Sequence, residues 1–294
     1  MNMQVTRRIL TFALMLVVPA CGDGNTPATP PDSPPPPPPP PPAPSFTLTT
    51  TPANLAQRLV DDQGRSIYFF AKDLMGTTAS ACPAALCPAT WIPVDVASPT
   101  VGTGLTPTDF GNLGSQSTWK GRPLYRFAND TTAAPTAGEN VGPGLWFVAS
   151  AYNLFLETVA TVTPQATPAG TAPGAPFFTN GGGRSVYFFK NDTRATATTP
   201  AANTCTPNAT CNALWTPWTK PATVVGPSTV LPTDITTIPV TFNGATVQQF
   251  VYKGWPLYFF NADVNAGQVA GDHYPNATTP LWFTINVSWN GTPN

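Results

Sequence analysis

The chain has 294 residues, and only 9% of them are charged, against roughly 25% in an ordinary globular protein. With 23 Gly and 38 Pro, the composition excludes coiled coils and helical bundles, which need charge-rich sequence with few helix breakers. A net charge of −1 without a basic block argues against nucleic acid as a partner. A single His and few carboxylates leave little material for acid–base catalysis or a multi-His metal site. We therefore expect neither an enzyme nor a cofactor-binding protein.

Residues 1–20 have the pattern of an export signal. Arg7 and Arg8 precede an apolar run that ends at Val18 and is shorter than the about 20 residues needed to span a bilayer. The segment Val18-Pro19-Ala20-Cys21 resembles the bacterial lipobox, which implies that Cys21 is acylated and becomes the mature N-terminus. An ordinary secretory signal and a twin-arginine signal are the alternatives. We expect a lipid-anchored protein of the bacterial cell envelope, held at the outer membrane.

Residues 21–45 form a low-complexity segment that begins with the acylated cysteine. Nine consecutive prolines, Pro34 to Pro42, prefer extended polyproline II, at about 3.1 Å per residue, and cannot build a core. We expect this disordered, Pro-rich stalk to tether the folded part away from the membrane. A ligand for proline-binding domains is the alternative, but the flanks of the run lack basic residues.

The remaining cysteines form two local pairs. Four residues separate Cys82 from Cys87, and five separate Cys205 from Cys211. In an oxidising compartment, each pair is expected to close a short disulfide loop. Metal binding is the alternative, but Cys pairs that bind metal usually recruit further Cys or His, and neither region contains any.

One motif with fixed spacing occurs four times. Each copy has a Gly, a Tyr four residues later, a Phe two residues after that, and an Asp three residues further on. The motif residues are Tyr68, Phe70 and Asp73; Tyr125, Phe127 and Asp130; Tyr187, Phe189 and Asp192; and Tyr258, Phe260 and Asp263. Four matches at one spacing indicate an internal repeat.

The copies are of two kinds, here named A and B. The A copies, first and third along the chain, are followed by a Cys pair and a Trp, whereas the B copies carry Pro-Leu before the Tyr and lead on to Leu-Trp-Phe. The order A-B-A-B predicts two homologous domains, which we call the first repeat (residues 46–160) and the second repeat (177–294). The Thr/Pro/Ala/Gly-rich segment 161–176 is the predicted linker.

Both domains are predicted to be mainly β and antiparallel. Ser66–Phe70 and Ser185–Phe189 are short runs of aromatic and β-branched residues, typical of strands. Asn243-Gly244 suits a type I′ turn and predicts a hairpin. The Lys-Gly pairs that open the two B copies predict further tight turns. Ala53–Val60 is the one segment expected to form a short helix.

Taken together, these motifs resemble a family of predicted bacterial lipoproteins, the secreted repeat of unknown function. The resemblance rests on the fourfold Tyr-x-Phe-x-x-Asp, on the Cys pair followed by Trp, and on Gly-x-Pro-Leu-Tyr, and it covers most of residues 60–150 and 180–285. It implies a lipid-anchored exported protein, and the family has no assigned activity.

The motif has a structural and a chemical interpretation. Tyr and Phe two residues apart share one face of a strand, so we expect the four aromatic pairs to form the core, with an aromatic ligand-binding platform as the alternative. Each motif Asp is expected to accept backbone N–H bonds from the following turn. Calcium is the alternative, with Asp130, Glu139, Asp263 and Asp272 as candidate ligands, because Glu139 and Asp272 lie nine residues beyond the Asp of each B copy.

The expected function follows from the tether, the duplication and the scarcity of catalytic groups. His273, the only histidine, is expected in a surface loop rather than as a haem or copper ligand. We expect a non-enzymatic module that binds an envelope polymer or a protein partner, with two linked copies raising avidity. A redox or metal-binding accessory protein of the envelope is the alternative, because the chain is exported and carries Cys pairs and aromatic clusters.

Overall fold

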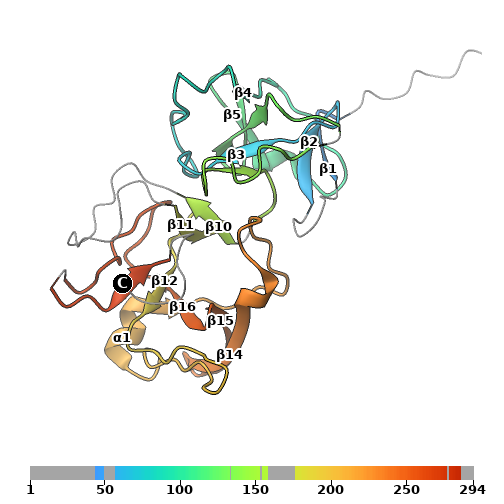
Figure 1. The fold of residues 1–294 in the computed structure, drawn as a ribbon. Coiled ribbons are helices and arrows are strands. Elements are labelled where there is room, and N and C mark those ends of the chain that lie inside the picture. The colour runs from blue at the N-terminus through green and yellow to red at the C-terminus, as the bar shows by residue number, and fades with distance from the viewer. Residues whose placement is uncertain are drawn as a thin grey trace, which may run out of the picture. The chain divides into compact units, whose positions relative to one another are not determined.

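The computed structural model describes residues 44–49, 57–132, 134–152, 154–157, 176–276 and 278–285. The predicted signal and Cys21 lie outside these residues, as do all but the ends of the predicted tether and linker. The described part is mainly β, and its named strands pair in antiparallel sheets, as predicted (Figure 1).

The first repeat contains three small sheets. In one, β1 (Phe46–Thr49) pairs with β2 (Arg58–Asp61). A four-stranded sheet has the order β4-β8-β3-β9 and consists of β3 (Tyr68–Phe70), β4 (Trp91–Pro93), β8 (Tyr125–Phe127) and β9 (Trp146–Val148). A 3-10 turn, Pro107–Asp109, leads into a three-stranded sheet of β5 (Phe110–Leu113), β6 (Gln116–Trp119) and β7 (Arg122–Pro123).

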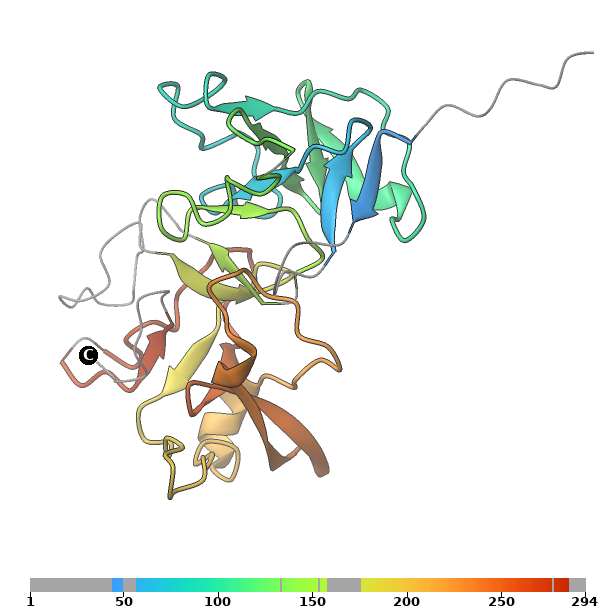
Figure 2. The same ribbon diagram turned by 45° about the vertical axis from the view of Figure 1, so that its right-hand side comes forward.

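In the second repeat one sheet contains six strands, and three of them are longer than any strand of the first repeat. Its main sheet has the order β14-β15-β16-β12-β17, and β13 also pairs with β16. The strands are β12 (Tyr187–Phe189), β13 (Trp215–Pro217), β14 (Ile235–Phe242), β15 (Ala245–Tyr252), β16 (Trp255–Phe260) and β17 (Trp282–Thr284). The long β14 and β15 lie side by side as orange arrows in Figures 1 and 2. One helix, α1 (Ala209–Leu214), and a 3-10 turn, Pro232–Asp234, lie in the connections between these strands.

The A and B strands are neighbours in both sheets. Tyr68 of β3 is directly opposite Tyr125 of β8, and Tyr187 of β12 is directly opposite Tyr258 of β16. A Trp strand flanks the B strand in each case, because β4 pairs with β8 and β13 pairs with β16. The two repeats therefore share one pairing scheme, as expected for homologous units.

Tight turns form where Gly and Asn or Lys allow positive φ. Asn243 and Gly244, with φ of 50° and 80°, connect β14 to β15 in the predicted hairpin. Lys253 and Gly254, with φ of 47° and 87°, connect β15 to β16, and the Lys-Gly pair at 120–121 makes the same turn in the first repeat. Left-handed φ values favour Gly at the second position of such turns.

Both faces of each A strand are buried, because its aromatic side chains alternate between two hydrophobic clusters. Tyr68 and Phe70 lie in one aromatic cluster, whereas Phe69 between them lies in a second hydrophobic cluster on the other face. Tyr187 and Phe188 divide between faces in the same way in the second repeat. The alternation expected of a strand thus places the motif aromatics in the core.

The expected helix at Ala53–Val60 is wrong where the structure describes it. Residues 58–61 form β2, which pairs with β1 and forms a bridge from Val60 to Ser66. Pairing on both sides overrides the weak helix preference of this run. Conversely, the short helix α1 is not expected from the sequence. Asn208 caps it by accepting a bond from the Cys211 backbone N–H at 3.1 Å.

Along the sequence, the predicted linker separates two strands that pair with each other. β10 (Leu154–Glu157) pairs with β11 (Phe177–Asn180). Leu59 of β2 donates its backbone N–H to Ala149 of the first repeat, and Phe178 of β11 donates to Ile285 of the second. The β10–β11 pair is therefore joined to the second repeat in the way that the β1–β2 pair is joined to the first. This equivalence favours β10 as the first strand of the second repeat, although the exact domain boundary stays a prediction. No helix among the described residues is long and apolar enough to cross a bilayer.

Candidate functional site

Four stacked rings form the centre of the first repeat. The Trp91 and Trp146 rings are parallel within 2°, with centroids 3.6 Å apart. Phe70 stacks on the outer side of Trp146 at 4.3 Å, and Phe127 lies against Trp91 at 4.5 Å. The A strand, the B strand and their two Trp strands each contribute one ring, so the stack joins all four strands of the sheet.

The second repeat contains the same stack. Trp215 and Trp282 are parallel within 4°, with centroids 3.5 Å apart. Phe189 stacks on Trp282 at 4.4 Å, and Phe260 lies against Trp215 at 4.5 Å. Aromatic stacking adds about 0.5–1.5 kcal/mol per pair beyond the burial of apolar area. Both stacks are therefore structural centres of their repeats.

Tyrosine and aspartate of the motif bond crosswise between the A and B copies. In the first repeat, the Tyr68 hydroxyl donates to the Asp130 carboxylate at 2.8 Å, and the Tyr125 hydroxyl donates to Asp73. Each bond joins a strand of one copy to the loop after the other copy. The two copies thus hold each other reciprocally.

The second repeat has the same crossed bonds. Tyr187 donates to Asp263 at 2.5 Å, and Tyr258 donates to Asp192 at 2.6 Å. All four tyrosines are fully buried, and Asp192 and Asp263 are nearly so. Their partners are 66 and 76 residues away along the chain, which is why the sequence indicates the residues but not the pairing.

Burial shifts the pKa values of these groups. Removal from water raises the pKa of Asp192 and of Asp263 to about 6, although a phenol and a backbone N–H bonded to each carboxylate lower it. Burial also raises the pKa of Asp73 and of Asp130. The phenol pKa of all four motif tyrosines is raised by burial and by the neighbouring carboxylate.

The motif aspartates also bind the loops that follow them. Asp73 accepts the Ala81 N–H at 2.6 Å, and Asp192 accepts the Thr204 N–H at 2.8 Å. Asp263 accepts the Ala270 N–H at 2.9 Å. Backbone capping is the role that the sequence predicts. The tyrosine partner is the feature that sequence reasoning missed.

The two predicted disulfides are present beside the aromatic stacks. Cys82 is bonded to Cys87, and Cys205 to Cys211. Cys82 and Cys87 contact the cluster of the first stack, and Cys205 and Cys211 belong to or contact that of the second. Each bridge closes the loop between an A strand and its Trp strand, so it restrains the approach of that Trp to the stack.

The four calcium candidates act as hydrogen-bond acceptors. Asp130 and Asp263 accept the tyrosine hydroxyls described above. Glu139 accepts the Val148 N–H at 2.7 Å, and Asp272 accepts the Thr284 N–H at 2.7 Å. The described residues contain no group of three or more His, Cys, Asp and Glu side chains able to hold a metal ion. Calcium binding at these positions stays an untested prediction.

His273 is not a surface residue, in contrast to the expectation. Only 6% of it is exposed, and its Nδ1 lies 2.8 Å from Oδ2 of Asp272. Its ring meets Phe283 edge to face at 4.9 Å. The sequence Gly-Asp-His-Tyr has the polarity of an exposed loop, but this loop folds back onto β17 and buries the imidazole.

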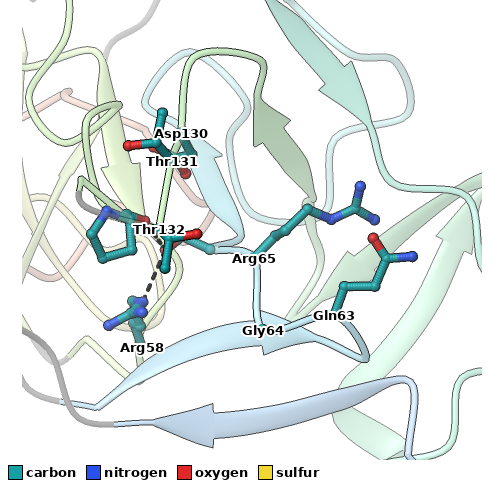
Figure 3. A pocket seen from close by; sticks show the side chains of 9 residues that line it. Arg58, Gln63, Gly64, Arg65, Asp130, Thr131 and Thr132 are labelled. Carbon is teal, nitrogen blue, oxygen red and sulfur yellow. Dashed lines mark hydrogen bonds between the residues drawn. The ribbon is translucent and has the colours of Figure 1, made fainter.

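A pocket of about 590 Å³ opens in the first repeat, beside the turn between β2 and β3. Its polar lining includes Arg58, Gln63, Arg65, Asp130, Thr131 and Thr132. Figure 3 shows Gly64 between Arg58 on one side and Gln63 on the other. Of this set, the sequence analysis assigns a role only to Asp130: Arg65 lies within the motif but is replaced by Trp in the fourth copy, and the other residues lie outside it.

Comparison with known proteins agrees with the motif resemblance. Residues 111–150, which span the first B copy and its Leu-Trp-Phe segment, match the model of a family described as a secreted repeat of unknown function. The matched family is the one that the motifs resemble, and its description as a secreted repeat suggests an exported protein. No curated protein and no solved structure matches the chain.

Proposed function

We propose that the protein is a bacterial lipoprotein, anchored through Cys21 to the outer membrane, that serves the cell envelope as a non-enzymatic binding module. The observation that carries the proposal is the crossed Tyr–Asp bonding. In both repeats, the ionisable groups of the motif are hydrogen-bonded to each other inside an aromatic core. These tyrosine and aspartate side chains stabilise the fold through their hydrogen bonds.

The disulfides support this role. A short bridge between each A strand and its Trp strand is typical of a domain that must persist in an oxidising compartment. The aromatic stacks and the bridges together make rigid scaffolds. A rigid scaffold is suited to recognition, because little conformational entropy is lost when a ligand binds.

The duplication supports binding to an extended or repetitive partner. Two linked copies of one domain convert a second contact into an intramolecular event, which raises avidity without new contacts. The predicted Pro-rich tether would give the two repeats reach from the membrane surface.

Co-sedimentation with envelope material tests the proposal. The exported chain carrying Cys21→Ala, which lacks the acylation site, is mixed with purified peptidoglycan sacculi and with delipidated envelope protein. Saturable binding to one of them, with the polymer or protein chemically unchanged, is the expected result. Absence of saturable binding, turnover of the polymer, or a stoichiometric metal in the purified protein would overturn it.

A motif variant separates a structural from a catalytic role. Tyr187→Phe removes one crossed bond of the second repeat and is expected to lower stability while leaving binding by the folded protein unchanged. Loss of a measurable activity in the folded Tyr187→Phe protein would place the motif in an active site instead.

A further inference from the structure

The pocket beside the turn between β2 and β3 concentrates arginines. Only six arginines follow the predicted signal, and two of them, Arg58 and Arg65, line this pocket. A third, Arg126, lies next to it, because its Nε and that of Arg65 both donate to Asp61 at 2.8 Å. In a chain with 9% charged residues, this clustering is a local departure from the composition.

The arginines are held by the fold. Arg58 is 7% exposed, and its Nε donates to the Ser66 hydroxyl at 2.9 Å (Figure 3). The Ser66 hydroxyl in turn donates to the Pro135 carbonyl. Arg65 is fixed by the buried Asp61, yet 46% of its side chain is exposed. Its guanidinium is therefore oriented and accessible at the same time.

The second repeat provides an internal comparison. Ser66 and Ser185 both bridge to the preceding strand, from Val60 and from Thr179, so Arg58 corresponds to Phe177. Phe177 is 1% exposed, and it brings no charge to that position.

The surroundings of the turn glycine also differ between the two repeats. A Cβ on Gly64 would meet no atom of the described residues within 4 Å, whereas on Gly183 it would lie 2.7 Å from the Cβ of Ala266, in the loop after β16. In the second repeat the Ala266 side chain thus covers the turn glycine, which no described residue covers in the first. The shared fold does not require the pocket.

We propose that this pocket of the first repeat binds an acidic saccharide, with the sugar carboxylate on the exposed Arg65. The inference rests on the proposed binding function and names its ligand class. Arginine recognises a carboxylate through paired, charge-assisted N–H bonds, and the buried Asp61 orients Arg65 for it. A pocket of about 590 Å³ lies within the range of small-ligand sites and has room for a few sugar rings.

The rest of the lining suits the hydroxyl groups of a sugar. The Gln63 amide and the hydroxyls of Thr131 and Thr132 both donate and accept hydrogen bonds, and the Asp130 carboxylate accepts them. The Pro135 ring offers an apolar surface for sugar C–H groups. A bare phosphate would use Arg65 but has no hydroxyl-bearing ring or C–H face to engage the rest of this lining.

Calorimetric titration with a defined probe tests the assignment. The exported chain carrying Cys21→Ala is titrated with a trimer of galacturonic acid, with the neutral galactose trimer, and with inorganic phosphate. The acidic trimer is expected to bind at one site per chain and about tenfold or more tighter than the neutral trimer, as a charged hydrogen bond predicts. Equal binding of both trimers, or tighter binding of phosphate, would overturn the assignment.

Two variants and a matched control locate the site. Arg65→Gln removes the accessible charge at an exposed position and is expected to weaken the acidic trimer about tenfold. Arg58→Phe installs the residue that the second repeat carries at this place and is expected to abolish binding. Arg184→Gln, at the equivalent of Arg65 in the second repeat, is the control and should bind like the parent chain.

The outcomes separate this inference from the proposed function. If the acidic trimer binds and Arg184→Gln weakens it as much as Arg65→Gln, the site is not this pocket. If the trimer fails to bind while the chain still co-sediments with envelope material, only the ligand assignment is wrong. If neither binds, the binding function itself is wrong.

Discussion

At the scale of single residues, the crossed Tyr–Asp pair explains why the motif has its spacing. The Tyr lies within a strand and the Asp just beyond its end, so each copy provides a donor in the sheet and an acceptor in its loop. Tyr258 donates to Asp192, and Asp192 also accepts the Thr204 N–H and hydroxyl. A buried carboxylate needs several such donors, because an unsatisfied buried charge is costly.

Removing one phenol should therefore destabilise the protein without removing its core. Tyr258→Phe keeps the ring and deletes the donor, so Asp192 loses one partner while remaining buried. We expect the free energy of unfolding to fall by about 1–3 kcal/mol, measured by denaturant unfolding.

Tyr274→Phe is the matched control for this change. Its ring contacts Phe260 and Trp215 of the same cluster, but its hydroxyl makes none of the four crossed bonds. It should change stability by less than about 0.5 kcal/mol. Equal losses in the two variants would show that the crossed bond contributes nothing specific.

The raised pKa values of Asp192 and Asp263 predict a pH dependence of stability. Both carboxyls have a folded-state pKa of about 6, above the ordinary value of 3.8, so the folded protein binds more protons between these values than the unfolded chain. Their contribution to stability is fully present below about pH 4 and is lost as the pH rises through 6. Two pKa units correspond to about 3 kcal/mol at most for each carboxyl.

Unfolding free energies at pH 4 to 7.5 test this sign. Asp192→Asn removes the titrating group, so the fall in stability with rising pH should become shallower in this variant, whatever its absolute stability. Asp109→Asn, at a more exposed position with 38% of the side chain accessible, is the control and should keep the parent slope. A parent protein whose stability rises between pH 4 and 6, with Asp192→Asn removing that rise, would contradict the direction of the shift.

At the scale of elements, the three-residue strands β4 and β13 are defined by their tryptophans. A strand this short has few ladder hydrogen bonds, so its position depends on packing. Trp91 and Trp215 provide this packing, because each ring lies between a second Trp ring and a Phe ring. The disulfide before each strand restrains the connection that delivers the Trp.

Truncating one tryptophan should show how much the aromatic stack contributes to the free energy of unfolding. Trp91→Ala leaves a cavity between Trp146 and Phe127 and is expected to cost about 3–5 kcal/mol. Trp91→Phe keeps a ring in the stack and should cost less. Near-ultraviolet circular dichroism should lose the signal of the coupled Trp pair in both variants. Similar stability of the Ala and Phe variants would contradict a role for stacking.

The sequence predicts the individual strands and turns better than it predicts which strands and side chains pair. The repeated spacing predicts the motif strands and their buried faces, and Asn243-Gly244 predicts the hairpin turn, because these are local signals. Local signals fail at β2, where pairing with β1 and Ser66 makes a strand of a run expected to be helical. They also fail for His273, whose burial depends on a loop folding back.

The candidate site was harder to predict than the fold. The Tyr–Asp partners are joined across 52 to 76 residues, and only the folded sheet brings them together. The pocket is accompanied by one sequence difference between the repeats, Arg58 against Phe177, and by different surroundings of the turn glycine, which is shared. The sequence shows the first difference, but it does not indicate that a space opens there, and it does not show the second.

At the scale of the whole molecule, the two repeats share a scaffold and differ in what they present. Strand order, ring stacks, crossed bonds and disulfides are the same in both. The pocket with its arginines belongs to the first repeat alone among the described residues. Duplication therefore preserved the groups that hold each repeat together, while a surface next to the motif diverged.

The predicted anchor determines where this surface acts. Cys21 lies outside the described residues, so its role rests on the lipobox resemblance and on its place before the Pro-rich segment. Acylation adds about 0.8 kcal/mol of membrane affinity per buried CH₂ group, and removing the acceptor sulfur removes all of it. Cys21→Ala should therefore shift the protein from the envelope fraction to the soluble exported fraction and abolish incorporation of labelled fatty acid.

The matched control for the anchor is the double variant Cys82→Ala with Cys87→Ala. It also removes cysteine, but from a disulfide of the folded part. This variant should lose stability, by about 2 kcal/mol for so short a loop, and still fractionate with the envelope and carry label. If Cys21→Ala stays in the envelope fraction and the parent chain takes up no fatty acid, the protein reaches the envelope by binding alone, and the first 45 residues serve only export and spacing.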